Sequence, residues 1–204
     1  MVVVGNGCGV HTHRGFRAFR GPQVIPLVPV VNITAIPLTE DSFRPYGTLL
    51  APGSGPPDFK GVASVGWKAP FEVDDVPLLM LLVSRFSGMQ FSRLERHFAV
   101  TQTFIPLGPN PALLAVAAPT DAGVIPQPED VRAFIIDGSY GYVLKRGTWH
   151  SVDRYPLYEA ETQIVIVTSR ATQTEIETRD RAAWHLTQEV DYAVYCGVTF
   201  ELVV

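Results

Sequence analysis

Two short stretches of this chain hold most of the side chains that could perform acid–base or metal chemistry. In the first, Glu95 and His97 stand two residues apart, so on a strand both point to one face while Leu94 points to the other. A carboxylate and an imidazole on one wall can form half of a metal site or an acid–base pair. On this segment alone, an exposed and charged hairpin end is the alternative interpretation.

The second stretch is Gly147–His150, which follows a strand-like segment ending at Lys145. A histidine after a tight glycine turn, beside a Trp149 that can pack against it, can act as a ligand or a base. A core histidine bonded to the backbone is the alternative here. We therefore expect His150 to join Glu95 and His97 only if the fold brings the two stretches together.

The elements that must position these residues are short strands separated by turns. Strand-like segments occur at 24–36, 78–84, 90–97, 101–105, 113–118, 133–136, 140–145, 163–169 and 190–204. We expect 24–36 to be an edge strand and 78–84 to be fully buried. Short helices are expected at 40–43, capped by Thr39, at 128–131 and at 179–186. Short strands at this spacing predict a mainly β sandwich or barrel.

Four phrases, in the same order along the chain, resemble one family. They are Pro37–Gly47, Leu94–His97 with Thr101–Leu107, Val131–Ile135, and Gly141 through Gly147-Thr148-Trp149-His150. Over residues 33 to 170 this pattern is similar to the ureidoglycolate lyases of the cupin superfamily. The resemblance implies a single-domain jelly-roll barrel with its site inside. The chain departs from the family pattern at Leu144, Ser151 and 168–171, so it resembles a divergent member.

The resemblance also implies an activity in purine (allantoin) catabolism, the cleavage of a C–N bond of ureidoglycolate to glyoxylate and urea. It places Glu95, His97, Gln102 and His150 around the reacting carbon. It further implies that Glu95, His97 and His150 can hold a divalent metal, nickel or zinc. Without a metal, His97 or His150 would carry the proton and Glu95 would fix its tautomer.

Four further side chains are candidates for binding the substrate. They are Arg93, Lys145, Trp149 and Tyr142. Arg96 has the opposite strand parity to Glu95, so we expect it to be a surface charge. A homodimer is expected from the resemblance, because cupins commonly pair through sheet edges.

Two other functions fit the same scaffold. Aromatic residues not expected in the family could line a site for a larger, more apolar molecule and support an isomerase, a cyclase or an eliminating enzyme. These residues are Trp67, Phe71, Phe91 and Tyr142. The third alternative is a non-catalytic binding module of the cupin type.

Composition bounds these hypotheses. The 204 residues are 47% hydrophobic and 18% charged, which argues against disorder. The net charge of −4 argues against general binding to nucleic acid, which needs a basic surface. Prolines interrupt both uncharged runs, 21–39 and 98–120, so neither is expected to span a membrane. Two cysteines, Cys8 and Cys196, favour a reducing, cytoplasmic location. We expect residues 1–22 to form an arm and 23–204 to form the barrel.

Overall fold

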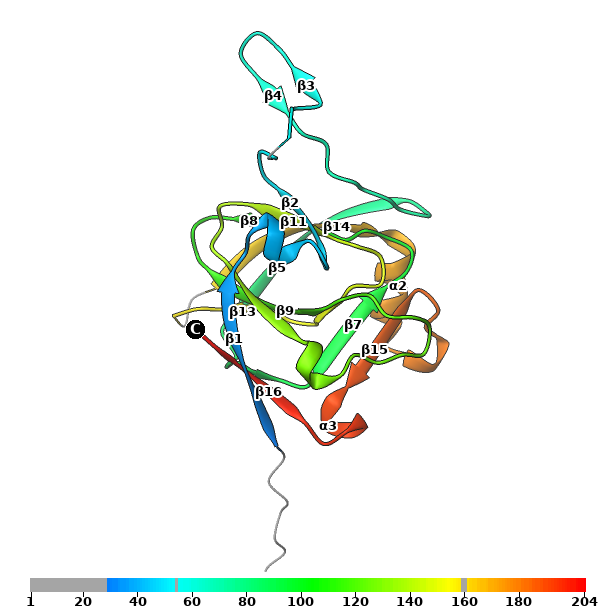
Figure 1. Cartoon of the computed structure of the whole chain (residues 1–204). Helices are drawn as coiled ribbons and strands as arrows, with labels where there is room; N and C mark the ends of the chain where they lie inside the picture. The colour runs from blue at the N-terminus through cyan, green and yellow to red at the C-terminus, as the bar shows by residue number, and fades with distance from the viewer. Residues whose placement is uncertain (1–28, 54, 159–160) are drawn as a thin grey trace, which may run out of the picture.

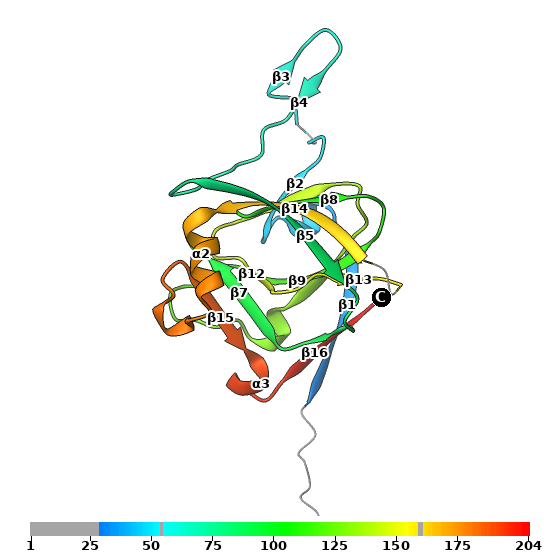
Figure 2. The same cartoon turned by 180° about the vertical axis from the view of Figure 1, so that it is seen from behind.

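The structure is a computed structural model that describes residues 29–53, 55–158 and 161–204. The expected arm at 1–22 therefore lies outside the described residues. Two β-sheets curl around a common interior, with few and short helices (Figures 1 and 2). The expected class, a mainly β barrel with a few short helices, is confirmed.

The larger sheet holds nine strands. In spatial order they are β15 (Thr187–Asp191), β7 (Arg93–His97), β12 (Trp149–Ser151), β9 (Ala112–Ala117), β10 (Arg132–Ile136), β1 (Val30–Pro37), β16 (Thr199–Val203) and β6 (Gln90–Phe91), with β13 (Tyr155–Pro156) also paired to β9. The expected edge strand lies inside this sheet instead, because β1 pairs in parallel with both β10 and β16.

The smaller sheet holds five strands. In spatial order they are β2 (Gly47–Leu50), β11 (Gly141–Leu144), β8 (Thr103–Leu107), β14 (Glu161–Ser169) and β5 (Pro77–Arg85). β5 alternates between partly buried and exposed residues along its whole length. The expectation of a fully buried strand at 78–84 is therefore wrong, because β5 is an edge strand and one of its faces is uncovered.

Strand β9 separates two hydrophobic cores. Its Leu114 and Val116 face the space between the sheets, where they join Phe104, Tyr142 and Phe134. Its other face contributes to a second core on the far side of the larger sheet, with residues such as Leu113, Leu94, Trp149 and Phe200. Because both faces of β9 are covered, its sequence is a continuous apolar run rather than an alternating one.

The helices partly follow the sequence. α1 (Glu40–Phe43) forms as expected, and the Thr39 hydroxyl accepts a hydrogen bond from the Ser42 amide. The helix expected at 179–186 is wrong, because that segment holds only the single turn η2 (Arg181–Ala183). The helix lies earlier, at α2 (Arg170–Thr178), which Ser169 caps and a left-handed Arg179 ends. The turn η1 (Pro128–Asp130) and the short helix α3 (Tyr192–Tyr195) complete the set.

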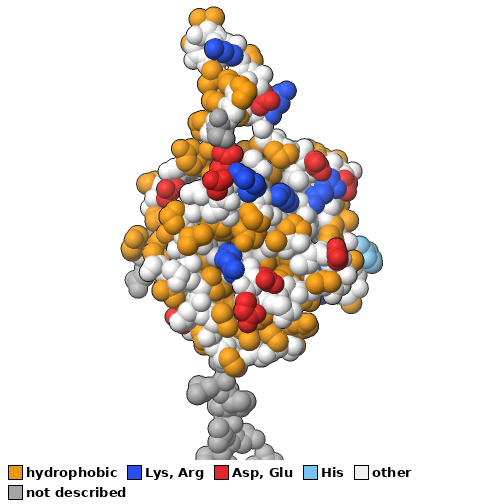
Figure 3. Space-filling view, viewed as in Figure 1, with side chains coloured by type: hydrophobic (Ala, Val, Ile, Leu, Met, Phe, Trp, Pro, Cys, Tyr) orange, Lys and Arg blue, Asp and Glu red, His pale blue; other side chains and the backbone are white. Residues whose placement is uncertain are grey.

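A hairpin of β3 (Phe59–Lys60) and β4 (Val65–Gly66) stands away from the barrel (Figure 1). Hydrophobic side chains are visible along this projection in Figure 3, and Phe59, Val62 and Val65 are exposed. The helices among the described residues are all too short to cross a membrane.

Candidate active site

Three neighbouring strands of the larger sheet bring the two chemical stretches together. Glu95 on β7 lies directly opposite His150 on β12, and His150 lies opposite Val116 on β9. These three side chains therefore share one face, the one that looks into the space between the sheets. His97, two residues beyond Glu95, adds a second imidazole to the same wall.

The three chemical side chains form one buried cluster. Their ligand atoms all lie within 4.8 Å of one another. Glu95 Oε1 is 3.7 Å from His97 Nε2 and 4.0 Å from His150 Nδ1, and the centroids of the two imidazole rings are 5.1 Å apart. The exposed hairpin end, which was the alternative for Glu95 and His97, is thus excluded by their burial.

Burial controls the ionisation of all three groups. It raises the pKa of Glu95 to about 7, although the positive charge of Arg154 pulls in the opposite direction. It lowers the pKa of His97 to about 4. It also lowers the pKa of His150 well below its ordinary value, and the neighbouring His97 and Arg154 lower the pKa of His150 further. Near neutral pH both imidazoles are therefore uncharged, and Glu95 is the group poised to exchange a proton.

Residues outside the cluster orient the imidazoles. His150 Nδ1 donates a hydrogen bond to the Ser151 carbonyl at 3.1 Å, which leaves His150 Nε2 unprotonated. His97 Nδ1 lies 3.1 Å from the hydroxyl of Thr187 on β15. The tautomer of His150 is thus fixed by a backbone carbonyl, and not by Glu95 as the metal-free scheme from the sequence expected.

Comparison with known proteins identifies the family of this chain. The family model described as ureidoglycolate lyase matches residues 30–185. This chain belongs to the ureidoglycolate lyase family. A ureidoglycolate lyase of Azotobacter vinelandii is 34% identical over 125 residues, which cover 56% of this chain and 72% of that protein. One of Pseudomonas syringae pv. tomato is 32% identical over 140 residues, covering 65% and 78%.

Among solved structures, RmlC from Streptococcus suis in complex with dTDP-D-xylose aligns over 48% of each chain. The two share 10% identity with a TM-score of 0.31.

One side chain of this lyase-family site escaped the sequence analysis. Arg154 is only 2% exposed and lies between β12 and β13. Its Nε donates to the Tyr142 hydroxyl at 3.0 Å, and its guanidinium lies over the ring of Phe104, 4.3 Å from the centroid. No repeat or motif marks this position, because the segment between the two strands has no periodicity.

The other predicted residues of the lyase-family site are placed as follows. Gln102 is buried directly before β8, and its Nε2 donates to the Thr168 hydroxyl at 3.4 Å. Tyr142 stacks on Phe104 and holds Arg154. Lys145 is exposed and its Nζ donates to the Arg44 carbonyl, so it is not joined to the cluster.

Two arginines on β7 differ from their expected places. Arg93 is partly exposed and pairs with Glu189 at 3.8 Å, outside the cluster. Arg96 is not a surface charge, since it is 1% exposed and its guanidinium lies over Trp149, 4.4 Å from the ring centroid. Trp149 in turn donates from Nε1 to the Thr120 hydroxyl. Arg96 and Trp149 thus belong to the far face of the larger sheet, where a second core replaces solvent.

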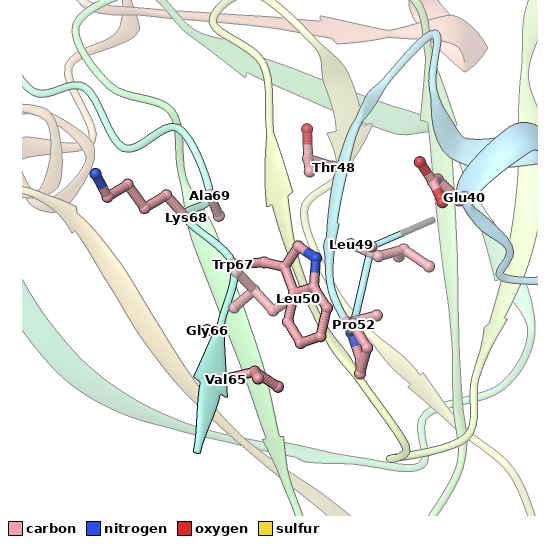
Figure 4. Close-up of a pocket in the computed structure, with 12 residues that line it drawn as sticks. Glu40, Thr48, Leu49, Leu50, Pro52, Val65, Gly66, Trp67, Lys68 and Ala69 are labelled. Carbon is pink, nitrogen blue, oxygen red and sulfur yellow. The ribbon is translucent and has the colours of Figure 1, made fainter. Parts of the chain in front are cut away.

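The aromatic residues that suggested a larger substrate do not gather at the cluster. Phe91 packs against Tyr155 and Phe200 in the second core, and Phe71 is exposed. Trp67 instead lines a surface groove of about 470 Å³ between β2 and β4, where its ring lies beside Leu50 and Pro52 (Figure 4). Of this set, Tyr142 alone lies at the site.

The cluster could hold a metal ion. Glu95, His97 and His150 offer one oxygen and two nitrogen ligands, a set that suits divalent transition metals. His97 Nε2 and His150 Nε2 are buried without a hydrogen-bond partner among the described residues. The opposite nitrogens are held by Thr187 and by the Ser151 carbonyl, and metal-binding histidines are commonly oriented by such a hydrogen bond on their other ring nitrogen. The residues present therefore fit the group that the family resemblance implies.

Proposed function

We propose that this chain is a ureidoglycolate lyase that cleaves a C–N bond of ureidoglycolate to give glyoxylate and urea. The observation that carries the proposal is the buried Glu95–His97–His150 cluster, which faces the barrel interior of a chain of this family. In this role the protein would act in allantoin breakdown in the cytoplasm.

The reaction needs a base for the hydroxyl proton and an acid for the departing nitrogen. The C–N electron pair leaves with the urea nitrogen, while the oxygen of the hydroxyl group forms the carbonyl of glyoxylate. Glu95, with a pKa of about 7, can accept the hydroxyl proton and return it to the nitrogen within one turnover. His150 Nε2, unprotonated, can accept a hydrogen bond from an O–H or N–H of the substrate.

Metal binding forms part of the proposal. In a metal-bound form of the site, Glu95, His97 and His150 would hold a nickel or zinc ion, whereas the proton transfer by Glu95 belongs to the metal-free form. When bound, such an ion would polarise an oxygen of the substrate. The role of the chain itself is to bury the ligands, to keep both imidazoles neutral and to hold His97 through Thr187.

An assay of both products tests the function. Purified protein should release glyoxylate and urea in equal amounts from ureidoglycolate, and elemental analysis should find a divalent metal that a chelator removes. His150→Ala should lower the rate by at least about 100-fold, since it removes a group at the reacting atoms. A folded protein that releases neither product, whether as purified or resupplied with nickel or zinc, would refute the assignment.

We also infer that two copies of the chain associate through the outer face of the smaller sheet. Along the edge strand β5, the exposed face carries Leu79, Leu81 and Val83, at 70%, 56% and 40% exposure, between Pro77 and Arg85 at its ends. Strands β5, β14 and β8 are neighbours in the smaller sheet (Figure 2). The register aligns Leu81 with Val165 of β14 and Ile105 of β8, so apolar residues continue across the three strands. A long apolar edge strand left uncovered invites pairing with another sheet.

Substitution of Leu81 with Lys should convert a dimer into a monomer, because it places a charge at the centre of this face. Light scattering coupled to gel filtration measures the mass of each form. Val194→Lys is the matched control, since Val194 is an exposed valine on α3 and should leave the dimer intact. A wild-type protein that stays monomeric at high concentration, or a dimeric Leu81→Lys variant, would contradict the inference.

A further inference from the structure

Arg154 carries a buried positive charge that its surroundings do not neutralise. Its Nη1 donates to the Ser151 and Asp153 carbonyls, at 2.9 and 3.3 Å, and its Nε donates to Tyr142. Among the described residues, no carboxylate forms an ion pair with it, and its Nη2 is buried without any hydrogen-bond partner. An unpaired charge in a protein interior is costly, so a buried guanidinium with an unpartnered Nη2 suits the binding of an anionic group.

The position of Arg154 ties it to the Glu95–His97–His150 cluster. Its Nη1 and the Nδ1 of His150 both donate to the same oxygen, the carbonyl of Ser151. Phe104, over which the guanidinium lies, also meets the His150 ring edge-on, with centroids 6.1 Å apart. Arg154 and His150 are therefore linked through the Ser151 carbonyl, which accepts a hydrogen bond from each, on the interior side of the barrel.

The charge of Arg154 affects the pKa of each residue of the cluster. It opposes the rise that burial causes in the pKa of Glu95, and it adds to the fall that burial causes in the pKa of both histidines. Because the imidazoles are neutral near neutral pH and burial keeps part of Glu95 protonated, the guanidinium gives the cluster a positive potential. A small anion would be attracted to it, and a carboxylate oxygen can accept a charge-assisted hydrogen bond from Nη2.

We propose that Arg154 binds the carboxylate of the substrate and thereby selects anionic 2-hydroxy acids over their neutral amides. This inference rests on the proposed function for its substrate. The Tyr142 hydroxyl and the Phe104 ring hold the guanidinium in place, so Tyr142 is a positioning residue. A carboxylate bound at Nη2 would place the adjacent hydroxyl-bearing carbon towards His150 and Glu95.

Two variants and a control test the assignment in steady-state kinetics. Arg154→Met keeps the length of the buried side chain and removes its charge, and it should lower kcat/KM for ureidoglycolate by about 100-fold or more, mainly through KM. Tyr142→Phe should raise KM several-fold while leaving Arg154 in the chain, a change that a purely structural role would not produce. Arg44→Met, an exposed arginine that contacts Asp41, should leave both constants unchanged.

Binding of oxamate to metal-free protein, measured by calorimetry, separates this inference from the proposed function. Wild-type protein should bind oxamate, and Arg154→Met should bind it at least about 30-fold more weakly. If oxamate binding depends on Arg154 but ureidoglycolate is not cleaved, the carboxylate site stands and the proposed function falls. If wild-type protein binds no oxamate, or if Arg154→Met and Tyr142→Phe both retain wild-type affinity and KM, the assignment of Arg154 is overturned. Should Arg154→Met fail to fold, Tyr142→Phe decides by the same two measurements.

Discussion

Replacement of Glu95 with Gln should lower kcat for ureidoglycolate cleavage by about 10²–10⁴-fold, the usual contribution of a positioned proton carrier. The amide keeps the size of the carboxyl group but can neither accept the hydroxyl proton nor return it to the leaving nitrogen. His97 and His150 do not substitute for it, because burial holds the pKa of each far below neutral and a proton on either ring is short-lived. Initial rates of glyoxylate release, measured at saturating substrate, give the comparison.

Glu201→Gln is the matched control for this loss. It makes the same chemical change on β16, where the carboxylate accepts a hydrogen bond from Gln90, and its rate should equal that of wild type. Circular dichroism and the melting temperature confirm that each variant is folded. If Glu95→Gln retains kcat within about threefold, Glu95 is not the proton carrier and that role must pass to another group.

The sequence predicted which side chains share one face of the site, but not which residues pack around them. The two-residue spacing of Glu95 and His97 places them on one face of any strand, whatever the fold around it. The addition of His150 required the pairing of β7 with β12, which the family resemblance supplied and local pattern did not. The three residues are indeed brought together, with their ligand atoms within 4.8 Å.

The sequence could not predict what contacts the two faces of the larger sheet. Strand parity correctly placed Arg96 and Glu95 on opposite faces of β7. Parity does not tell solvent from a second core, however, and here Arg96 is buried against Trp149. Arg154 was missed because it lies in an irregular segment, and its burial depends on Tyr142 and Phe104, which belong to the other sheet. Such contacts are set by how two sheets close and leave no local signature.

The same Glu95→Gln variant should be more stable than wild type at high pH when both proteins are free of metal. The pKa of Glu95 is about 7 in the folded chain against an ordinary value of 4.5, so the folded state binds more protons between these two values. Wild-type stability therefore falls as the pH rises from 4.5 through about 7, and Gln, which does not titrate, is spared that loss. The difference of about 2.5 pKa units corresponds to roughly 3 kcal/mol.

Urea unfolding of chelator-treated protein, at one pH near 4.5 and one above 7, measures this effect. The histidines act with the opposite sign, since lowered folded pKa values make stability rise with pH, but they are present in both proteins and largely cancel in the comparison. An equal difference at both pH values would mean that Glu95 has the same pKa in the folded and unfolded chains, as it would if Arg154 fully offset the effect of burial. Added nickel or zinc should reverse the order, because a ligating carboxylate gives up its proton and the metal then stabilises wild type more than the variant. The carboxyl group that destabilises the empty barrel would thus carry the proton in the metal-free site and bind the ion in the metal-bound one.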